Sequence, residues 1–332
     1  MSNTVLYRAA CAVVSSLVIS SLASAAITIE TVPVGTAGNA ADTTGYGAVA
    51  YEYNIGKYEV TAGQYAAFLT AVAATDTYAL YNTSMSNTST GSGIARSGSS
   101  GSYTYSVDPA FVNRPVNYVG LGDSMRFANW LHNGQLTGAQ TASTTEDGTY
   151  FVNGANSSAA LYPITRKSGA TWAVTSEDEW YKAAYHKNNG IGASYFMYPT
   201  SSNTAPGRDM ADASGNNVNI YGNPYPIDSG KYTTLVGEFQ GSKSPYNTFD
   251  QGGNVFEWNE AQIGGSYRGV RGGAWNSDGR YLRADFPDGG NTPGGGSNDV
   301  GFRVSQVPEP GSMAVLVLGV SGLLVRRRGA GR

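Results

Sequence analysis

Residues 250–258, which read Asp-Gln-Gly-Gly-Asn-Val-Phe-Glu-Trp, constrain the fold of this chain more than any other stretch. Asp250 and Glu257 flank two adjacent glycines, whose backbone can adopt conformations closed to other residues. A segment bent in this way can direct carboxylates and main-chain carbonyls toward one hard cation, as calcium requires. We therefore expect a tightly turned calcium-binding loop. The alternative is a solvated turn with a buried glutamate paired to an arginine such as Arg271.

Residues 1–26 have the anatomy of a secretory signal peptide. Arg8 precedes an apolar run over residues 9–22, and the small residues at positions 23–26 form a cleavage site. The alternative is a short membrane anchor, but the run contains serines and is short for a span. Cys11, the single cysteine of the chain, lies in this leader. The mature protein is therefore expected to contain neither thiols nor disulfides, despite an oxidising destination.

Residues 307–332 combine three elements of a sorting signal. Val-Pro-Glu-Pro at 307–310 precedes an apolar run over 313–325, which ends in three arginines at 326–328. A short apolar stretch with a basic end stops translocation and leaves the arginines on the cytoplasmic side. The three elements together resemble the PEP-CTERM sorting signal of Gram-negative bacteria. That resemblance implies contact with the inner membrane during export and recognition by an exosortase. It also implies removal of the tail and delivery to the envelope or an extracellular polysaccharide matrix. A permanent single-span anchor is the alternative.

Charge is scarce in this chain. Charged residues make up 14% of it, whereas 44 glycines and 23 tyrosines are present, so we expect a loop-rich surface whose polar groups are mostly uncharged. The net charge of −3 and the lack of a basic stripe before residue 326 argue against nucleic acid as a partner. About 280 residues remain without the two ends, which is enough for one large domain or two small ones.

Three amphipathic helices are predicted from local signals. The first begins at a capping box formed by Thr61 and Gln64. The second runs over residues 123–132, with its apolar side chains on one face. The third begins at Ser176, whose hydroxyl can bond the amide of Glu179 while the Glu179 carboxylate reaches back.

Short strands are expected between long irregular segments. The expected strands cover residues 51–58, 172–174, 270–275 and 301–305. The segment 81–106 is rich in serine, threonine and glycine, and 288–299 is glycine-rich, so both are expected to be loops. So much ordered loop in one domain needs something to hold it, and bound cations are the most natural candidates.

Several blocks of this sequence resemble, in order, the formylglycine-generating enzyme or sulfatase-modifying-factor family. The blocks cover residues 57–68, 113–131, 175–184, 250–258, 267–275 and 301–304. The resemblance implies an α+β fold of the elaborated C-type-lectin-like type, with small twisted sheets, few helices and much irregular structure. The expected organisation is a signal peptide (1–26), a lead-in (27–49), one sulfatase-modifying-factor-like domain (50–306) and the sorting segment (307–332).

The same resemblance implies two calcium sites. The first would use the side chains of Asp250 and Glu257 and the backbone carbonyls of Gly253 and Val255. The second would use the side chains of Asn219 and Asp228 and the backbone carbonyls of Ile220 and Gly230. One or two Ca²⁺ ions are therefore expected, because hard cations prefer such a mixture of carboxylate and carbonyl oxygens.

The catalytic cysteines of the family are missing from this sequence. The resemblance implies that members which oxidise a sulfatase cysteine to formylglycine use two cysteines shortly after the Arg-Gly-Gly block. The thiolates of such a pair suit Cu(I) as ligands. Ser277 and Leu282 stand at the matching positions. A hydroxyl and an isobutyl group can neither hold Cu(I) nor form a mixed disulfide. We therefore expect no copper and no formylglycine-generating oxidase activity.

Other catalytic sites find little support in the sequence. His132 and His186, the two histidines, fall near predicted helix C-termini, where a cation is favourable without a catalytic role. They lack the spacing of a zinc or facial-triad iron site. The sequence contains neither a G-x-S-x-G motif nor a phosphate-binding glycine loop. Paired carboxylates for sugar hydrolysis stay open, because they come together only in three dimensions.

Two functions are compatible with these features. The first is a calcium-stabilised, non-catalytic binding or scaffold protein of the cell surface or exopolysaccharide matrix, with a glycan or a surface protein as ligand. Its contact surface would comprise Trp275, Asn276, Arg280, Tyr281 and Arg283, because aromatic rings and planar donors bind sugars and peptides. The alternative is that the rings are core and the arginines pair with local acids. The second function is an enzyme of this family with a different chemistry, or an accessory subunit of an exported enzyme.

Overall fold

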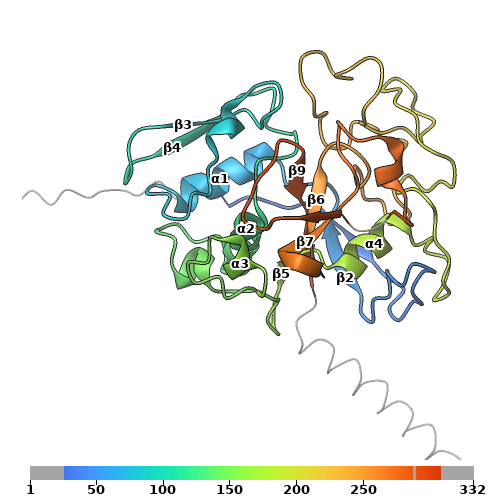
Figure 1. Ribbon diagram of the computed structural model, residues 1–332, viewed down its shortest axis with the longest axis horizontal. Coiled ribbons are helices and arrows are strands. Elements are labelled where there is room, and N and C mark those ends of the chain that lie inside the picture. Colours follow the sequence, from blue (N-terminus) through green and yellow to red (C-terminus); the bar gives the residue numbers. More distant parts are fainter. Residues whose placement is uncertain (1–25, 287–288, 308–332) are drawn as a thin grey trace, which may run out of the picture.

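The computed structural model describes residues 26–286 and 289–307 of the 332-residue chain. The expected signal peptide, apart from its last residue, and the apolar run at 313–325 lie outside the described residues. Within the described ranges, every helix is too short or too polar to cross a membrane. Short strands and helices alternate with long irregular segments, as Figure 1 shows.

One four-stranded antiparallel sheet brings together segments from both ends of the domain. Its strands, in spatial order, are β1 (Thr31–Val34), β2 (Tyr53–Gly56), β10 (Val304–Gln306) and β5 (Trp172–Val174). Ser305 of β10 lies opposite Ile55 on one side and Ala173 on the other. The last described strand therefore sits between elements that come early in the chain, and β1, within the expected lead-in, forms the edge of the sheet.

A second four-stranded sheet carries the glycine-rich motif. Its strands, in spatial order, are β8 (Gly289–Asn291), β7 (Tyr267–Arg271), β6 (Phe256–Ile263) and β9 (Val300–Phe302). The pair β6–β9 is parallel and the other two pairs are antiparallel. A register shift between Trp258 and Gln262 interrupts the β6–β7 ladder, which is the signature of a bulge.

Four α-helices accompany the sheets, and two of them begin at the capping boxes that the sequence predicts. They are α1 (Ala62–Val72), α2 (Leu121–His132), α3 (Ser158–Leu161) and α4 (Glu177–Tyr185). At the start of α1, the amide of Gln64 donates to the Thr61 hydroxyl, and the Thr61 amide donates to the Gln64 side chain. Ser176 and Glu179 make the same reciprocal pair before α4.

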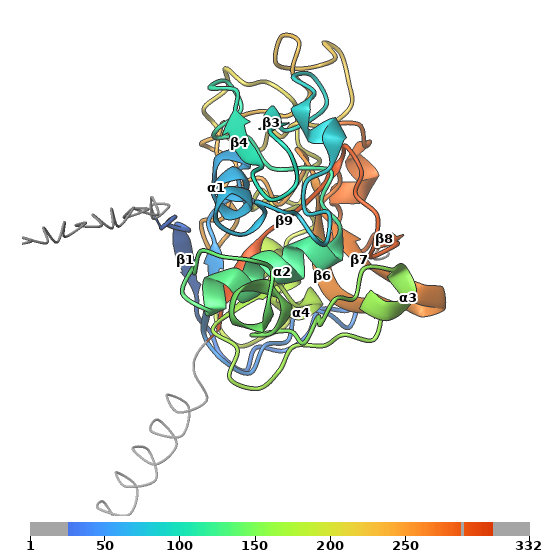
Figure 2. The ribbon, with the colours of Figure 1, turned by 90° about the vertical axis from the view of Figure 1, so that its left-hand side faces the viewer.

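The main hydrophobic core lies between α1, α2 and the strand β9. Five buried aromatic side chains pack there with ring centroids between 5.3 and 6.4 Å apart: Tyr65, Phe68, Phe127, Trp130 and Phe302. Most of these pairs are tilted or edge-to-face, the arrangement that the ring quadrupoles favour. The helices α1 and α2 lie beside the sheets on one side of the molecule, and the long segment between α4 and β6 covers the other (Figures 1 and 2).

Two segments that were expected to be loops contain strands. A hairpin of β3 (Ile94–Ser97) and β4 (Thr104–Val107) falls within 81–106 except for its last residue, and β8 lies within 288–299. In β4 polar and apolar residues do alternate, and Tyr105 and Val107 pack against the main core, but the run is only four residues long. The strand β8 consists of two glycines and an asparagine and has no hydrophobic pattern at all. These two loop predictions were therefore wrong, because the strands are too short or too polar to stand out from their surroundings.

Two strand boundaries also differ from expectation. The strand expected over 270–275 is β7, which ends at Arg271, because Gly272 and Gly273 have positive φ angles of 97° and 69°. The strand expected over 301–305 is split at Arg303 into β9 and β10. Since β9 belongs to the second sheet and β10 to the first, the chain changes sheets at this arginine.

Candidate functional site

The loop before β6 is as tightly turned as its glycines suggest. Asp250 and Asn254 both have positive φ, at 59° and 57°, and Gly253 lies between them at 86°. The Gly253 amide donates to the Gly272 carbonyl at 2.9 Å. A Cβ at position 253 would clash with the Asn219 carbonyl oxygen. Glycine is needed here because the backbone approaches another segment too closely for any side chain.

Glu257 is buried and paired with an arginine. Arg303 donates to it from Nε at 2.9 Å and from Nη2 at 2.8 Å, and Trp180 donates from Nε1 at 2.7 Å. Arg271, the partner that the sequence suggested for such a pair, instead binds Glu177. A bidentate pair of this kind satisfies both oxygens of the carboxylate.

Two further carboxylates lie close to this pair. Asp250 accepts a hydrogen bond from the Gly237 amide at 2.5 Å, and burial raises its pKa to about 6. Glu59 is 2% exposed, and burial, with the nearby Asp250 carboxylate as the next cause, holds its pKa well above the usual range. We call Glu59, Asp250, Glu257 and Arg303 the carboxylate cluster. It holds three acids and one guanidinium.

Glu59 is the member of this cluster that the sequence analysis did not single out. Neither of its carboxylate oxygens has a hydrogen-bond partner within the described part of the chain. Its signal in the sequence is weak: an acid between Tyr58 and Val60, just before the N-cap of α1. Its three neighbours in the cluster, Asp250, Glu257 and Arg303, lie 191, 198 and 244 residues further along the chain, so no local pattern could reveal them.

The carboxylate cluster fits a hard cation better than the predicted ligand set does. The oxygens of Glu257 are already taken by Arg303 and Trp180, whereas Glu59 offers two buried oxygens. Among the described residues, no three acidic, histidine or cysteine side chains converge as metal ligands. A cation here would therefore combine two carboxylates with main-chain oxygens and water, which calcium accepts.

The second predicted calcium site is arranged differently. Asp228 forms an ion pair with Arg114, and the Ile220 carbonyl accepts from Arg208 Nε at 2.6 Å. The side-chain amide of Asn219 donates to the Tyr232 carbonyl and to Asn254. Gly230 supplies a positive φ of 76° in the same loop region. Arginines thus bond one carboxylate oxygen of Asp228 and the Ile220 carbonyl, two of the oxygens that would hold the ion.

A patch of aromatic rings lies beside the segment that follows the Arg-Gly-Gly block. We call Tyr221, Tyr225, Tyr232 and Trp275 the aromatic patch. Trp275 is 5% exposed and forms its base, with Tyr232 at 4.5 Å and Tyr225 stacked at 5.9 Å between ring centroids. Tyr221 and Tyr225 are 59% and 39% exposed and lie 4.9 Å apart. The sequence singled out only Trp275 of these four.

Main-chain bonds fix the loop that carries the exposed tyrosines. The Tyr221 amide donates to the Ser277 carbonyl at 2.9 Å, which ties the loop to the segment after the Arg-Gly-Gly block. Arg208 is inserted beneath the loop and donates to the carbonyls of Ile220 and Pro224. This loop belongs to the long segment that Figure 1 shows in yellow.

The remaining residues of the predicted contact surface are engaged locally. Arg280 binds Asp278, and Arg283 binds Asp285, each two residues away and through two guanidinium nitrogens. Tyr281 packs against aromatic neighbours, and the exposed Asn276 donates to Asp299.

The two positions that match the family's cysteines lie inside the body of the protein. The Ser277 hydroxyl accepts a hydrogen bond from the Ala274 amide, and Leu282 packs among buried apolar side chains.

Both histidines lie at helix C-termini and are held by hydroxyl groups. His132 Nδ1 lies 2.8 Å from the Thr171 hydroxyl, and His186 Nδ1 lies 2.7 Å from the Tyr246 hydroxyl. Burial lowers the pKa of both imidazoles. Both imidazoles are therefore less readily protonated than a free histidine, and their hydrogen bonds give each a structural role at its helix end.

Small curled sheets, few helices and long irregular segments define an elaborated C-type-lectin-like α+β fold. A profile of the sulfatase-modifying factor enzyme 1-like domain (FGE-sulfatase) matches residues 32–307, most of the chain. The chain therefore belongs to this family. A second profile, of the PEP-CTERM protein-sorting motif, matches residues 306–328 and marks the protein for export and association with the envelope or surface through an exosortase-type system.

Solved structures share this fold at low sequence identity. Treponema denticola variable protein 1 is similar over 84% of this chain and 95% of its own, with 18% identity and a TM-score of 0.50. The crystal structure of CarF is similar over 85% of this chain and 99% of its own, also with 18% identity and a TM-score of 0.50. A comparison with curated proteins gives no match. At such identity the likeness shows the fold alone.

Proposed function

We propose that this protein is an exported, calcium-stabilised binding protein without catalytic activity, and that the aromatic patch binds a neutral glycan at the cell surface or in the exopolysaccharide matrix. The PEP-CTERM motif supports the location. The observation that carries the binding role is the exposure of two tyrosine rings over a buried tryptophan. Exposed aromatic faces on a fixed loop are unusual on a surface that serves no contact.

The geometry of the patch suits a sugar ring. The apolar face of a pyranose stacks on an aromatic ring, while its hydroxyls need donors and acceptors at the edge. Tyr221 and Tyr225 supply rings and phenolic hydroxyls, and Asn223 and Asn276 are exposed beside or near them. Because the loop is held by main-chain bonds, little conformational entropy is lost when a ligand binds.

The electrostatics favour an uncharged ligand. Arg280 and Arg283 are each neutralised by an aspartate two residues away, and Arg208, the cation at the loop itself, donates to the carbonyls of Ile220 and Pro224. A strongly anionic polymer would have to compete with those intramolecular pairs. A neutral polysaccharide needs no such exchange, so it is the ligand class that the described surface supports best.

The test is a binding assay of the purified full-length chain on immobilised neutral glucans, mannans and galactans. Tyr225→Ala is expected to weaken binding to the recognised glycan at least tenfold, which corresponds to about 1.4 kcal/mol. The matched control is Tyr267→Ala, since Tyr267 is 45% exposed and lies outside the patch at the start of β7. This variant should bind as the parent does.

Two results would overturn the proposal. Equal binding by Tyr225→Ala and the parent would remove the patch from recognition, and capture of a surface protein but no glycan would assign a different ligand class. Stoichiometric copper or iron in the purified protein, together with turnover, would favour an enzyme instead.

A further inference from the structure

Glu59 stands out among the buried charged groups of this protein. Most acids in the described interior are bonded to an arginine, a tyrosine or a main-chain amide, as Glu257, Glu179 and Asp250 illustrate. Glu59 is equally buried, yet neither of its oxygens meets a donor in the part of the chain that the structure describes. A carboxylate without a hydrogen-bond partner is costly to bury, so the site requires a further partner.

Charge in the carboxylate cluster points to a cation as that partner. Arg303 neutralises one of the three acids through its two bonds to Glu257. Glu59 and Asp250 remain: burial raises the pKa of both carboxyl groups, and the Asp250 carboxylate raises that of Glu59 further. One divalent ion between them would bring the cluster to neutrality and supply the missing contact for Glu59.

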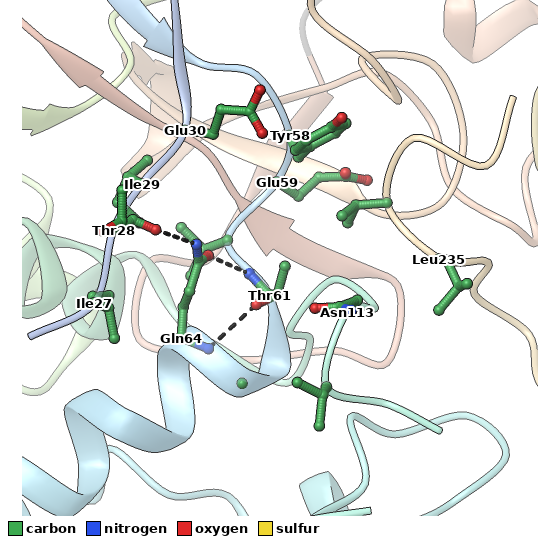
Figure 3. Close-up of a pocket in the computed structure, with 14 residues that line it drawn as sticks. Ile27, Thr28, Ile29, Glu30, Tyr58, Glu59, Thr61, Gln64, Asn113 and Leu235 are labelled. Carbon is green, nitrogen blue, oxygen red and sulfur yellow. Dashed lines mark hydrogen bonds between the residues drawn. The ribbon is translucent and has the colours of Figure 1, made fainter. Parts of the chain in front are cut away.

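The position of Glu59 also provides a route for an ion. Glu59 lines a pocket of about 670 Å³ together with Tyr58, Asn113 and Leu235. Figure 3 shows its side chain directed away from Thr28, toward the side of the pocket where Leu235 lies. Leu235 and Val236, which line that side, directly precede Gly237, whose amide donates to Asp250. An ion entering through the pocket would therefore meet Glu59 and Asp250 beneath the 235–237 segment.

We propose that Glu59 and Asp250 together bind one hard divalent cation, with calcium as the probe, and that Glu257 serves as the partner of Arg303 and is not a ligand. This inference rests on the proposal that calcium stabilises the protein, and it replaces Glu257 by Glu59 as a ligand of the ion. The remaining ligands would be main-chain oxygens and water, because two carboxylates alone do not fill a coordination shell of six to eight oxygens.

The experiment measures the melting temperature of the full-length chain in CaCl₂ and in EDTA, and its affinity for calcium by calorimetric titration. The parent is expected to bind calcium and to melt higher in its presence, since a ligand that binds only the folded state stabilises it. Glu59→Gln should lose at least 100-fold in calcium affinity and show no calcium-dependent shift. In EDTA it should melt no lower than the parent, because a neutral amide replaces an unpaired carboxylate.

The matched control is Glu257→Gln, the same substitution at the neighbouring acid. It should melt lower than the parent in both conditions and keep the calcium-dependent shift. Asp250→Asn is the second ligand variant and should lose the shift as Glu59→Gln does, so the proposal stays testable if one variant fails to fold. Terbium emission sensitised by nearby aromatic residues gives a direct measure of binding in the parent.

The outcomes separate this inference from the proposed function. If Glu257→Gln loses the shift and Glu59→Gln keeps it, the Glu59 assignment is wrong while a calcium-stabilised protein stands. A calcium concentration of about 10 mM is roughly a thousandfold above the dissociation constant of a weak calcium sensor. If the melting temperature of the parent does not change at that concentration, both the calcium stabilisation and the Glu59–Asp250 site are wrong. Glu59 and Asp250 would then share a proton, and glycan binding would still be tested separately by Tyr225→Ala.

Discussion

Arg303 binds Glu257 at the point where the chain passes from one sheet to the other. Its guanidinium donates two hydrogen bonds to Glu257 in β6 and a third, of 2.7 Å, to the Gly56 carbonyl in β2. Both side chains are fully buried. One side chain thus joins the second sheet, through β6, to the first sheet, through β2, at the residue where the strand expected over 301–305 is divided in two.

Loss of this arginine should be severely destabilising. Arg303→Met leaves Glu257 as a buried charge without its main partner, which typically costs 3–5 kcal/mol. The measurement is urea unfolding followed by tryptophan fluorescence. The double variant Arg303→Met/Glu257→Leu should recover part of the loss, because no buried charge is then left unpaired. A single variant within about 1 kcal/mol of the parent would contradict a structural role for the pair.

The close approach at Gly253 predicts a steric cost beyond the strain of its backbone. Gly253→Ala adds a Cβ that clashes with the Asn219 carbonyl oxygen, at a φ of 86°. Gly45 has nearly the same φ, 88°, with open space around it, so Gly45→Ala measures backbone strain alone, about 1 kcal/mol. The free energy of unfolding should fall clearly more in Gly253→Ala than in Gly45→Ala. Equal losses would show that the loop relaxes around the methyl group.

The capping box of α1 should contribute about 1 kcal/mol. Thr61→Ala removes the hydroxyl that accepts from the Gln64 amide at the helix start. Thr70→Ala is the matched control, since Thr70 lies exposed within the same helix and bonds the Ala66 carbonyl. Alanine has the higher helix propensity, so the control should be neutral or slightly stabilised in thermal unfolding. The cap has no role if the two variants melt alike.

Asp123 should make stability fall as pH rises through neutrality. Burial raises its pKa to about 7 in the folded protein, from an ordinary 3.8, while it accepts a hydrogen bond from the Gly120 amide. A carboxyl with a raised folded pKa binds its proton more tightly in the native state. Its contribution is therefore complete below about pH 4 and is lost as pH rises through about 7.

Urea midpoints in EDTA at pH 5 and pH 8 test this dependence. Asp123→Asn keeps an acceptor for the Gly120 amide but cannot titrate, so its stability should decline less between these two pH values than that of the parent. The chelator keeps the state of the carboxylate cluster the same in both proteins. Identical slopes would mean that Asp123 ionises normally.

Local features of the fold could be predicted because their causes lie within a few residues. The capping boxes at Thr61 and Ser176 each span four positions, and both helices begin where these boxes stand. The tight loop at 250–254 follows likewise from its glycines. The β3–β4 hairpin was missed because each strand has only four residues, and the short alternation around Tyr105 and Val107 does not stand out within a segment rich in serine, threonine and glycine.

The sequence by itself determined the starts of α1 and α4, the glycine loop, the family and the sorting motif, since each is written in a contiguous block. Only the tertiary structure decided which charges and rings meet. Glu257 binds an arginine 46 residues further along the chain and not the nearby Arg271, and Glu59 is buried near Asp250 without a hydrogen-bond partner among the described residues. The physical reason is that the energy of a buried charge depends on distance and desolvation, and neither quantity exists until the chain has folded.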